Sequence, residues 1–240
     1  FKDALPAAAA ARAIAFGIRR LGEAIEPIEC PLADGGEGSL DALLAATGAE
    51  RRTATVQDAL GRPARADWGW LPERRTAFVE LAEASGIQAL APAERTALHS
   101  TTQGVGELIR AALDAGAERL LLTLGGSATN DGGAGMLAAL GARLLDGNGG
   151  DLPPGGAALA ELAELDLSGL DPRLADLRVE AAVDVDNPLL GARGASAVFG
   201  PQKGATPEEV ARLDAALARF ADVTAAALGE EHRELPGAGA

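Results

Sequence analysis

The chain has 240 residues, of which 48% are hydrophobic and 3% aromatic, and its 35 acidic side chains outnumber the 21 basic ones to give a net charge of −14. This length is enough for one large or two modest α/β domains around a buried core. The negative charge argues against nucleic acid and against an anionic membrane surface as partners. No apolar run reaches the roughly 20 residues that a membrane-spanning helix needs.

Three residue types that often carry chemistry are scarce. The one cysteine, Cys30, excludes an intrachain disulfide, is expected in the core, and fits the reducing cytoplasm, where we expect the protein. His99 and His232 have no motif around them, so a histidine-ligated metal or a histidine base is not expected. Only Lys2 and Lys203 are lysines, whereas 19 of the 21 basic residues are arginine. Both could remain by chance, or each could mark a place that needs a compact ammonium.

The first 48 residues predict a helix, a strand, a loop and a second helix. Residues 6–26 place apolar side chains on one helical face, and residues 27–32 are typical of a short strand. Residues 34–38, with the sequence DGGEG, then form a loop. The following helix covers residues 39–47 and ends at Gly48, a residue that readily adopts the left-handed conformation at a helix end.

The middle of the chain predicts three kinds of structure in turn: an antiparallel meander, a helix and a buried strand. Three short segments separated by turn residues predict a small antiparallel meander, namely 52–57, 62–70 and 76–80. A helix follows, capped by Thr101 or Thr102 and running to Ala115. Residues 119–124 are a nearly continuous apolar run, the pattern of a strand that is buried on both faces of a parallel sheet.

The last third again alternates helices and strands. A helix is expected to follow a glycine-rich segment and to continue to about Leu145, and a strand is expected over 177–185. Thr206, Pro207 and Glu209 form a capping box with proline at the first helical position, and the helix behind it ends at Gly229. This alternation predicts an α/β fold.

The glycine-rich loop, residues 125–135 with the sequence GGSATNDGGAG, joins the end of a strand to the start of a helix. Ligands bind at this place in open α/β sheets, and free N–H groups at a helix start favour phosphate or carboxylate. Ser127, Thr129 and Asn130 add donors, while Asp131 is a candidate for metal or hydroxyl contacts. A turn that only packs the helix onto the strand is the alternative, but such a turn rarely needs five glycines together with these polar residues. The loop matches neither the Walker motif nor the dinucleotide fingerprint.

Two further strand ends carry oxygen ligands. In the aspartate loop, residues 34–38, Asp34 and Glu37 suit Mg²⁺ coordination or deprotonation of a substrate hydroxyl, although they could merely interact with the next helix dipole. Asp184 and Asn187 follow another predicted strand and could complete such a site, or could belong to a plain turn before Pro188.

The two lysines occupy similar positions. Lys203 lies in a tight turn, GPQKG, just before the capped helix, and Lys2 lies just before the first helix. Positive charge at helix entrances is where an otherwise acidic protein would hold a polyphosphate. This shared position favours a functional role, more strongly for Lys203 than for Lys2.

Seven motifs together, in this order and at these spacings, resemble the bacterial glycerate kinase family over all 240 residues. They are FKD (1–3), ADGGEG (33–38), ELAEASG (80–86), GGSATNDGGAGM (125–136), DVDNP (184–188), FGPQKG (199–204) and PGAGA (236–240). The resemblance implies an ATP- and Mg²⁺-dependent kinase that phosphorylates a hydroxyl of D-glycerate to give 2- or 3-phosphoglycerate. Whether the protein forms a homodimer stays open.

The resemblance also implies a two-domain α/β fold. One domain would be flavodoxin-like (Rossmann-like), with a parallel sheet built from both ends of the chain, and the other a mixed α/β domain formed by the middle. We expect residues 1–90 to form the N-terminal part of the flavodoxin-like domain with the meander, and residues 91–240 to form the domain that carries the glycine-rich loop. Compared with the family, the strand before Phe1 and the C-terminal third after Ala240 are expected to be missing.

Site residues follow from the same motifs. Lys203 and the backbone of residues 125–133 would hold the anionic groups, Asp34 or Asp184 would hold Mg²⁺ or accept the hydroxyl proton, and Asn130 and Asn187 would orient hydroxyls. Asp34, Asp184 and Lys203 are therefore the expected catalytic residues, and the two aspartates are the expected metal ligands. The expected substrate and nucleotide contacts are Lys2, Gly35, Gly36, Glu37, Ser127, Ala128, Thr129, Asn130, Asp131, Gly132 and Asn187.

Two other functions stay open at this stage. One is a kinase of another small hydroxy acid, and the other is a truncated, non-catalytic fragment that keeps ligand loops. A Rossmann oxidoreductase is least favoured, because the dinucleotide fingerprint is absent.

Overall fold

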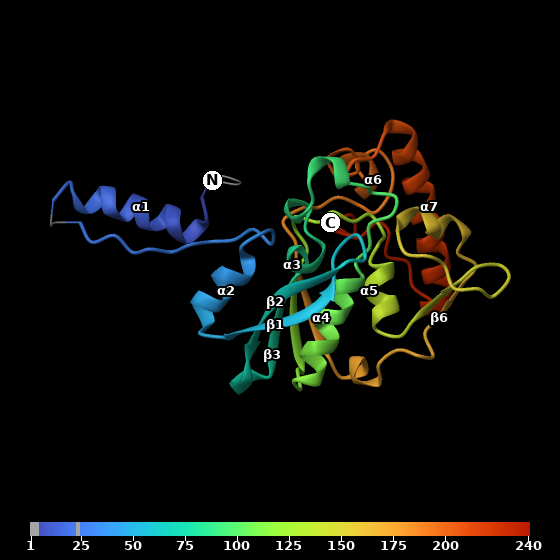
Figure 1. Ribbon diagram of the computed structural model, residues 1–240, viewed down its shortest axis with the longest axis horizontal. Coiled ribbons are helices and arrows are strands. Elements are labelled where there is room, and N and C mark those ends of the chain that lie inside the picture. Colours follow the sequence, from blue (N-terminus) through green and yellow to red (C-terminus); the bar gives the residue numbers. More distant parts are fainter. Residues whose placement is uncertain (1–4, 23–24) are drawn as a thin grey trace.

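The computed structural model describes residues 5–22 and 25–240, so the predicted ligand Lys2 lies outside the described residues. Within these residues a five-stranded mixed sheet has the strand order β1-β2-β3-β4-β7 (Figure 1). Its strands are β1 (Glu50–Gln57), β2 (Pro63–Leu71), β3 (Thr76–Glu80), β4 (Arg119–Thr123) and β7 (Arg178–Ala182). A separate two-stranded sheet pairs β5 (Arg143–Leu145) with β6 (Glu164–Asp166).

Seven α-helices and six short 3-10 helices accompany the strands in the described residues. The α-helices are α1 (Ala7–Arg19), α2 (Ser39–Thr47), α3 (Leu81–Ser85), α4 (Gln103–Asp114), α5 (Ala134–Ala139), α6 (Ala195–Phe199) and α7 (Pro207–Leu228). Short 3-10 helices connect them at η1 (Pro72–Arg74), η2 (Ile87–Ala89), η3 (Pro92–Glu94), η4 (Gly156–Glu161), η5 (Pro172–Ala175) and η6 (Pro201–Lys203). The expected α/β class is confirmed. In the described part of the chain, no helix combines the length and the apolar character needed to cross a membrane.

Strand direction divides the sheet into two halves. β1, β2 and β3 form the predicted antiparallel meander, whereas β3, β4 and β7 run parallel. The carboxyl ends of the three parallel strands therefore lie at one edge, which is where α/β sheets bind ligands. β3 and β4 are neighbours in the sheet although they lie on opposite sides of residue 90, and the division of the chain into two domains there stays a prediction.

Two hydrophobic clusters hold these layers together. In the first, Val105 and Leu108 of α4 pack with Val79 of β3 and Leu120 of β4, all at most 3% exposed. The second surrounds α7, whose apolar side chains Leu213, Leu217 and Phe220 are buried. The capping box at Thr206 and Glu209 is present as predicted. Burial of each apolar stripe, rather than helix propensity alone, fixes the position of its helix.

The predicted strand at 27–32 is wrong. These residues are irregular, Ile28 is 90% exposed, and Cys30 is exposed rather than buried in the core. Figure 1 shows α1 and this segment extending away from the sheet. A strand needs a neighbour for its backbone N–H and C=O groups, and the five-stranded sheet does not include this segment. The first helix is also shorter than predicted, because it ends at Arg19 and its apolar side chains Ile14 and Phe16 are exposed.

The helix predicted to reach Leu145 is wrong as well. α5 ends at Ala139, and Arg143–Leu145 forms strand β5. Gly141 causes the change, because its φ of +107° takes the chain out of the helical path. Its hydrogen atom faces the carbonyl of Gly169 so closely that a Cβ could not fit. The apolar pattern of this stretch therefore continues through a change of secondary structure.

Candidate active site

Three loops meet at the carboxyl edge of the parallel strands. Gly125 N–H donates to the carbonyl of Gly35 at 2.8 Å, and Leu124 N–H donates to the carbonyl of Ala182, the last residue of β7, at 3.3 Å. A Cβ added to Gly125 would lie 2.6 Å from the Cα of Gly36. The aspartate loop, the glycine-rich loop and the segment after β7 are thus in backbone contact, which only glycine allows at this point.

Asp34 and Asp184 are both exposed at this edge. One oxygen of Asp34 accepts the N–H of Gly36 at 3.0 Å, and Asp184 lies two residues beyond the end of β7. A Cβ on Gly35, next to Asp34, would lie 3.1 Å from the carbonyl of Ala182. Two exposed carboxylates at one edge of the sheet suit Mg²⁺, because this ion typically binds one or two protein carboxylates and takes its other ligands from phosphate and water. In the described residues, this edge included, no group of three or more His, Cys, Asp and Glu side chains is placed to hold a metal ion.

Glu37 is half-buried against the glycine-rich loop. A Cβ on Gly126 would lie 2.6 Å from the carboxyl carbon of Glu37, and Gly126 has φ of +74°. One carboxylate oxygen of Glu37 is buried without a hydrogen-bond partner. The glycine therefore leaves room for an acidic side chain directly over the loop.

Lys203 is the most unusual residue of the site, because its charged side chain is only 4% exposed. Its Nζ donates to Ser127 Oγ at 2.7 Å and to the Thr129 carbonyl at 2.6 Å, and it lies over the Phe199 ring. Burial lowers the pKa of Lys203 to about 8, although the Asp131 carboxylate opposes this shift. A buried ammonium tied to a glycine-rich loop places positive charge where an anion would bind.

Asp131 fixes the loop from inside rather than facing outward. It is 1% exposed, and its carboxylate accepts the N–H and the hydroxyl of Thr102, both at 2.9 Å. It also accepts the N–H groups of Gly133 and Gly135, each at 3.2 Å. Asp131 thereby connects the starts of α4 and α5. Its hydrogen bonds favour a structural role, and its predicted ligand role stays a prediction.

Several other predicted contacts are engaged within the protein. Asn130 is buried and donates to Ser196 Oγ at 3.0 Å, which leaves its side-chain oxygen without a partner. The N–H of Ala128 donates to the Ser85 carbonyl. Asn187 donates its side-chain amide to the Arg193 carbonyl at 2.7 Å. Gly132 is exposed on the loop, whereas Gly35 and Gly36 are buried under it.

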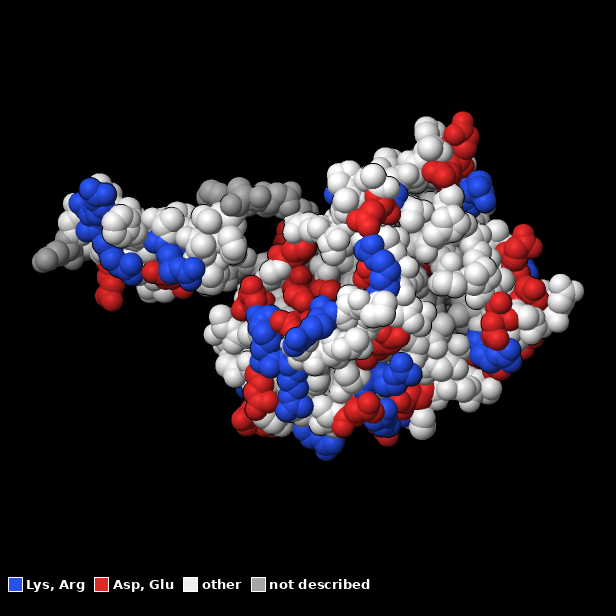
Figure 2. Space-filling model, in the orientation of Figure 1, with Lys and Arg blue, Asp and Glu red and all other residues white. Residues whose placement is uncertain are grey.

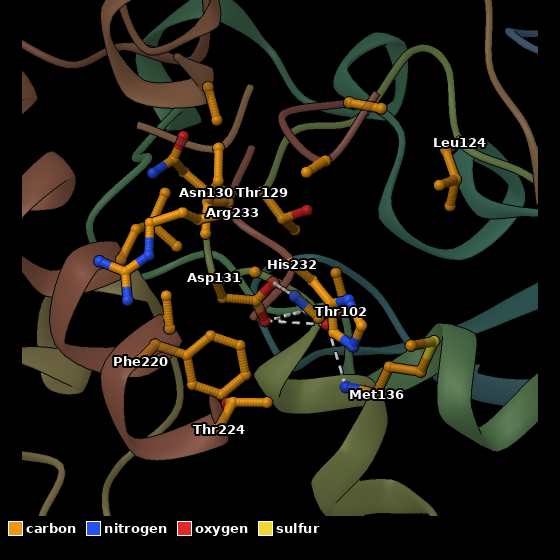
Figure 3. A pocket seen from close by; sticks show the side chains of 18 of the residues that line it. Thr102, Leu124, Thr129, Asn130, Asp131, Met136, Phe220, Thr224, His232 and Arg233 are labelled. Carbon is orange, nitrogen blue, oxygen red and sulfur yellow. Dashed lines mark hydrogen bonds between the residues drawn. The ribbon is translucent and has the colours of Figure 1, made fainter. Parts of the chain in front are cut away.

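A cavity of about 370 Å³ opens beside this loop (Figure 3). Ser127, Thr129 and Lys203 are among its lining residues. Figure 3 shows the ring of Phe220, from α7, among the side chains that line it. The remaining wall includes apolar residues of β4, α5 and α7, and the segment 230–240 closes one side. His232, around which the sequence shows no motif, belongs to this lining, and so does Phe220, which no sequence motif singles out. Neither showed a distinguishing sequence signal, since a helical apolar stripe gives no sign that one ring faces a cavity.

A second, more open cavity of about 820 Å³ lies beside Asp34 and Glu37. The first turns of α2 line one side of it, and residues 5–8 and 31–33 line the other. On the face that Figure 2 shows, arginine side chains lie next to acidic ones. The ion pairs of the described residues include Arg62 with Asp58 at 2.6 Å. Arg62 is thus paired with a carboxylate, in contrast to the buried ammonium of Lys203, which bonds to the uncharged oxygens of Ser127 and Thr129.

Residues 1–240 match the family described as the glycerate kinase family. The chain belongs to this family. It is 50% identical to the glycerate kinase of Bacillus subtilis and 45% identical to the glycerate 2-kinase of Escherichia coli, covering all of this chain and 63% of each relative. A crystal structure of a candidate glycerate kinase 2 from Salmonella typhimurium LT2 is 48% identical with a TM-score of 0.88, over all of this chain and 64% of that one. The chain thus spans somewhat less than two thirds of these glycerate kinase family members.

Proposed function

We propose that this chain carries a phosphate-binding and substrate-binding part of an ATP-dependent kinase that phosphorylates D-glycerate to 2- or 3-phosphoglycerate, with Mg²⁺ as the metal. The observation that carries the proposal is the buried ammonium of Lys203, held by Ser127 and Thr129 of the glycine-rich loop at the ligand-binding edge of the sheet. The names of the similar proteins support the choice of glycerate as the acceptor.

Phosphoryl transfer asks a protein mainly for positioning and charge neutralisation, because the transition state is loose. Lys203 supplies a fixed positive charge that needs no rearrangement when the anion binds. The backbone of residues 125–132, ahead of α5, completes the anion site in this proposal, whereas the first N–H groups of α5 are already bonded to Asp131 and Thr102. We assign the anionic groups of the nucleotide to this place, and its base to the adjoining cavity, where the Phe220 ring and neighbouring apolar side chains suit a flat heteroaromatic group.

The aspartate loop takes the other substrate in this proposal. Asp34 and Asp184 are exposed and lie on adjoining segments, so one holds Mg²⁺ while the other accepts the proton of the reacting hydroxyl. When bound to Asp34 or Asp184, Mg²⁺ would neutralise charge on the phosphates. Glu37, whose buried oxygen has no protein partner, lies between the two loops and would orient a hydroxyl of glycerate.

The direct test is an assay of this 240-residue chain with ATP, Mg²⁺ and D-glycerate, with 2- and 3-phosphoglycerate separated by chromatography. We expect turnover with D-glycerate and much less with lactate or tartronate. Equal turnover with all three acids would favour a kinase of another hydroxy acid. Binding of ADP and glycerate by the chain without turnover would favour the non-catalytic fragment.

A further inference from the structure

Glu80 is a buried acid that the proposed reaction does not use. It is the last residue of β3 and only 3% exposed, and it begins the ELAEASG segment. One carboxylate oxygen accepts the N–H of Gly38 at 3.1 Å, and the other accepts the N–H of Leu40 at 2.7 Å. The two donors lie 42 and 40 residues away in sequence, at the end of the aspartate loop and in the first turn of α2.

These contacts replace a missing helix cap. The first N–H groups of a helix have no partner within the helix, and a side-chain oxygen at the N-cap position usually satisfies one of them. The N-cap of α2 is Gly38, which has no side chain, and a carboxylate from a distant strand takes over this task. A negative charge at this position also complements the positive end of the helix.

The aspartate loop is consequently held from two sides. Gly35 accepts the N–H of Gly125 from the glycine-rich loop, and Gly38 donates to Glu80. Asp34 immediately precedes Gly35, the residue that is hydrogen-bonded to the glycine-rich loop. We infer that Glu80 is a positioning residue, which fixes the aspartate loop against the glycine-rich loop and so sets the place of Asp34 relative to the substrate. The role of Asp34 in this inference rests on the proposed function.

The surroundings of Glu80 make the contact sensitive to pH. The acidic groups that face it are Glu37 from the aspartate loop and Glu83 from α3, and burial together with these charges raises the pKa of Glu80 to about 7, against the two N–H donors that lower it. The ionised carboxylate accepts both N–H groups as a charged acceptor, whereas protonation weakens it. The loop is therefore held more firmly as the pH rises through about 7.

Glu83 provides a matched control. It lies three residues further on, burial likewise raises its pKa, and its carboxylate accepts a backbone N–H, that of Asp67 in β2, at 3.1 Å. Glu80→Gln replaces one acceptor oxygen with a donor facing a backbone N–H, with no change in size. We expect E80Q to lower kcat by roughly 10- to 100-fold, as a small misplacement of a reacting group does, while the KM for ATP changes less than about twofold. The rise of kcat with pH near 7 should disappear in E80Q. In E83Q it should persist but move to lower pH, because the Glu83 charge that helps to raise the pKa of Glu80 is gone.

Hydrogen exchange of the Gly38 and Leu40 amides keeps the test independent of turnover. Relative to wild type, exchange should be at least about tenfold faster in E80Q and unchanged in E83Q. If E80Q does not fold, the wild-type amides serve instead, and their protection should fall as the pH drops through 7, after correction for intrinsic exchange. Unchanged exchange, a wild-type kcat and pH profile in E80Q, or an equal loss in E83Q would each overturn the inference. A wild-type chain that never phosphorylates glycerate would instead remove the proposed function and leave the exchange result to decide on Glu80.

Discussion

The glycine-rich loop and the aspartate loop both contain several glycines and precede a helix, but they are held in place differently. The loop at 125–133 is fixed from within, because Asp131 accepts four hydrogen bonds and Lys203 bonds to Ser127 and Thr129. Inside the aspartate loop, Asp34 accepts the N–H of Gly36, and the loop is held from outside by Glu80 and Gly125, while the Asp34 side chain stays exposed. The difference indicates two kinds of site. Lys203 with Ser127 and Thr129 forms a fixed, charged cradle, whereas Asp34 is an accessible carboxylate on the other loop. Changes that affect only one loop should therefore separate anion binding from proton and metal handling.

The largest effect is expected from Lys203→Met, which removes the charge of the cradle and keeps the length of the side chain. Turnover should fall roughly 10²- to 10³-fold, because a preorganised positive charge contributes most in a buried site. Steady-state kinetics with ATP and D-glycerate measure this, and circular dichroism checks that the fold persists. Near-normal turnover would mean that Lys203 only ties the loop together.

Asp34→Asn and Asp184→Asn should act on the other side of the comparison. Each should lower kcat roughly 10²-fold, since an amide neither accepts the hydroxyl proton nor binds Mg²⁺ as strongly. The dependence of the rate on Mg²⁺ concentration should move to higher values in at least one of them. Asp186→Asn, an exposed neighbour of Asp184 that pairs with Arg193, is the control. Unchanged rates and Mg²⁺ dependence in both variants would exclude these aspartates.

A third change probes the cavity beside the glycine-rich loop. Ala225 of α7 lines the cavity, whereas Ala226, the next residue, is exposed and lies outside it. Ala225→Phe should raise the KM for ATP about tenfold or more by filling space that the base needs, and kcat should change little. Ala226→Phe should behave as wild type. If both variants keep the wild-type KM, the base binds elsewhere.

The smallest expected effect is the pH dependence of the cradle itself. Burial lowers the pKa of Lys203 to about 8, so the side chain is charged below that pH and loses its charge above it. The value of kcat/KM for ATP should therefore fall as pH rises through about 8, because this ratio reports the free enzyme. The free energy of unfolding changes with pH in the opposite direction, because the contribution of Lys203 to it rises with pH. Between pH 8 and 10.5 the unfolded chain binds more protons, so Lys203 makes unfolding less favourable as pH rises in that window. A kcat/KM profile that stays flat from pH 7 to 9 would contradict the assignment.

Local signals in the sequence were sufficient for much of this architecture. The meander, α2 and the capping box before α7 were predicted because turn residues, glycine stops and cap residues act over a few positions. The strand at 27–32 was predicted for the same kind of reason and does not form, since pairing depends on a neighbour that the sheet does not supply. The end of α5 was missed because Gly141 sits inside an apolar pattern that suits helix and strand alike.

The candidate site was predictable in its motifs but not in its connections. Lys203, Asp34 and the glycine-rich loop were expected to act together, and the structure does bring the two loops into backbone contact and Lys203 onto one of them. The internal role of Asp131 was not visible, because its partner Thr102 lies 29 residues away. Glu80 was missed for the same reason, since a carboxylate that caps a helix 40 residues away leaves no local pattern.

The backbone contact between Gly125 and Gly36 has one more consequence. With no side chain between them, the separation of the two ligand loops equals the thickness of two polypeptide backbones, and a Cβ on Gly125 would already lie 2.6 Å from its neighbour. The spacing of the two loops at this point is thus set by covalent dimensions. In the proposed function, side chains around this edge would decide which molecule is held, while the distance between the two bound substrates would follow this fixed spacing of the backbones.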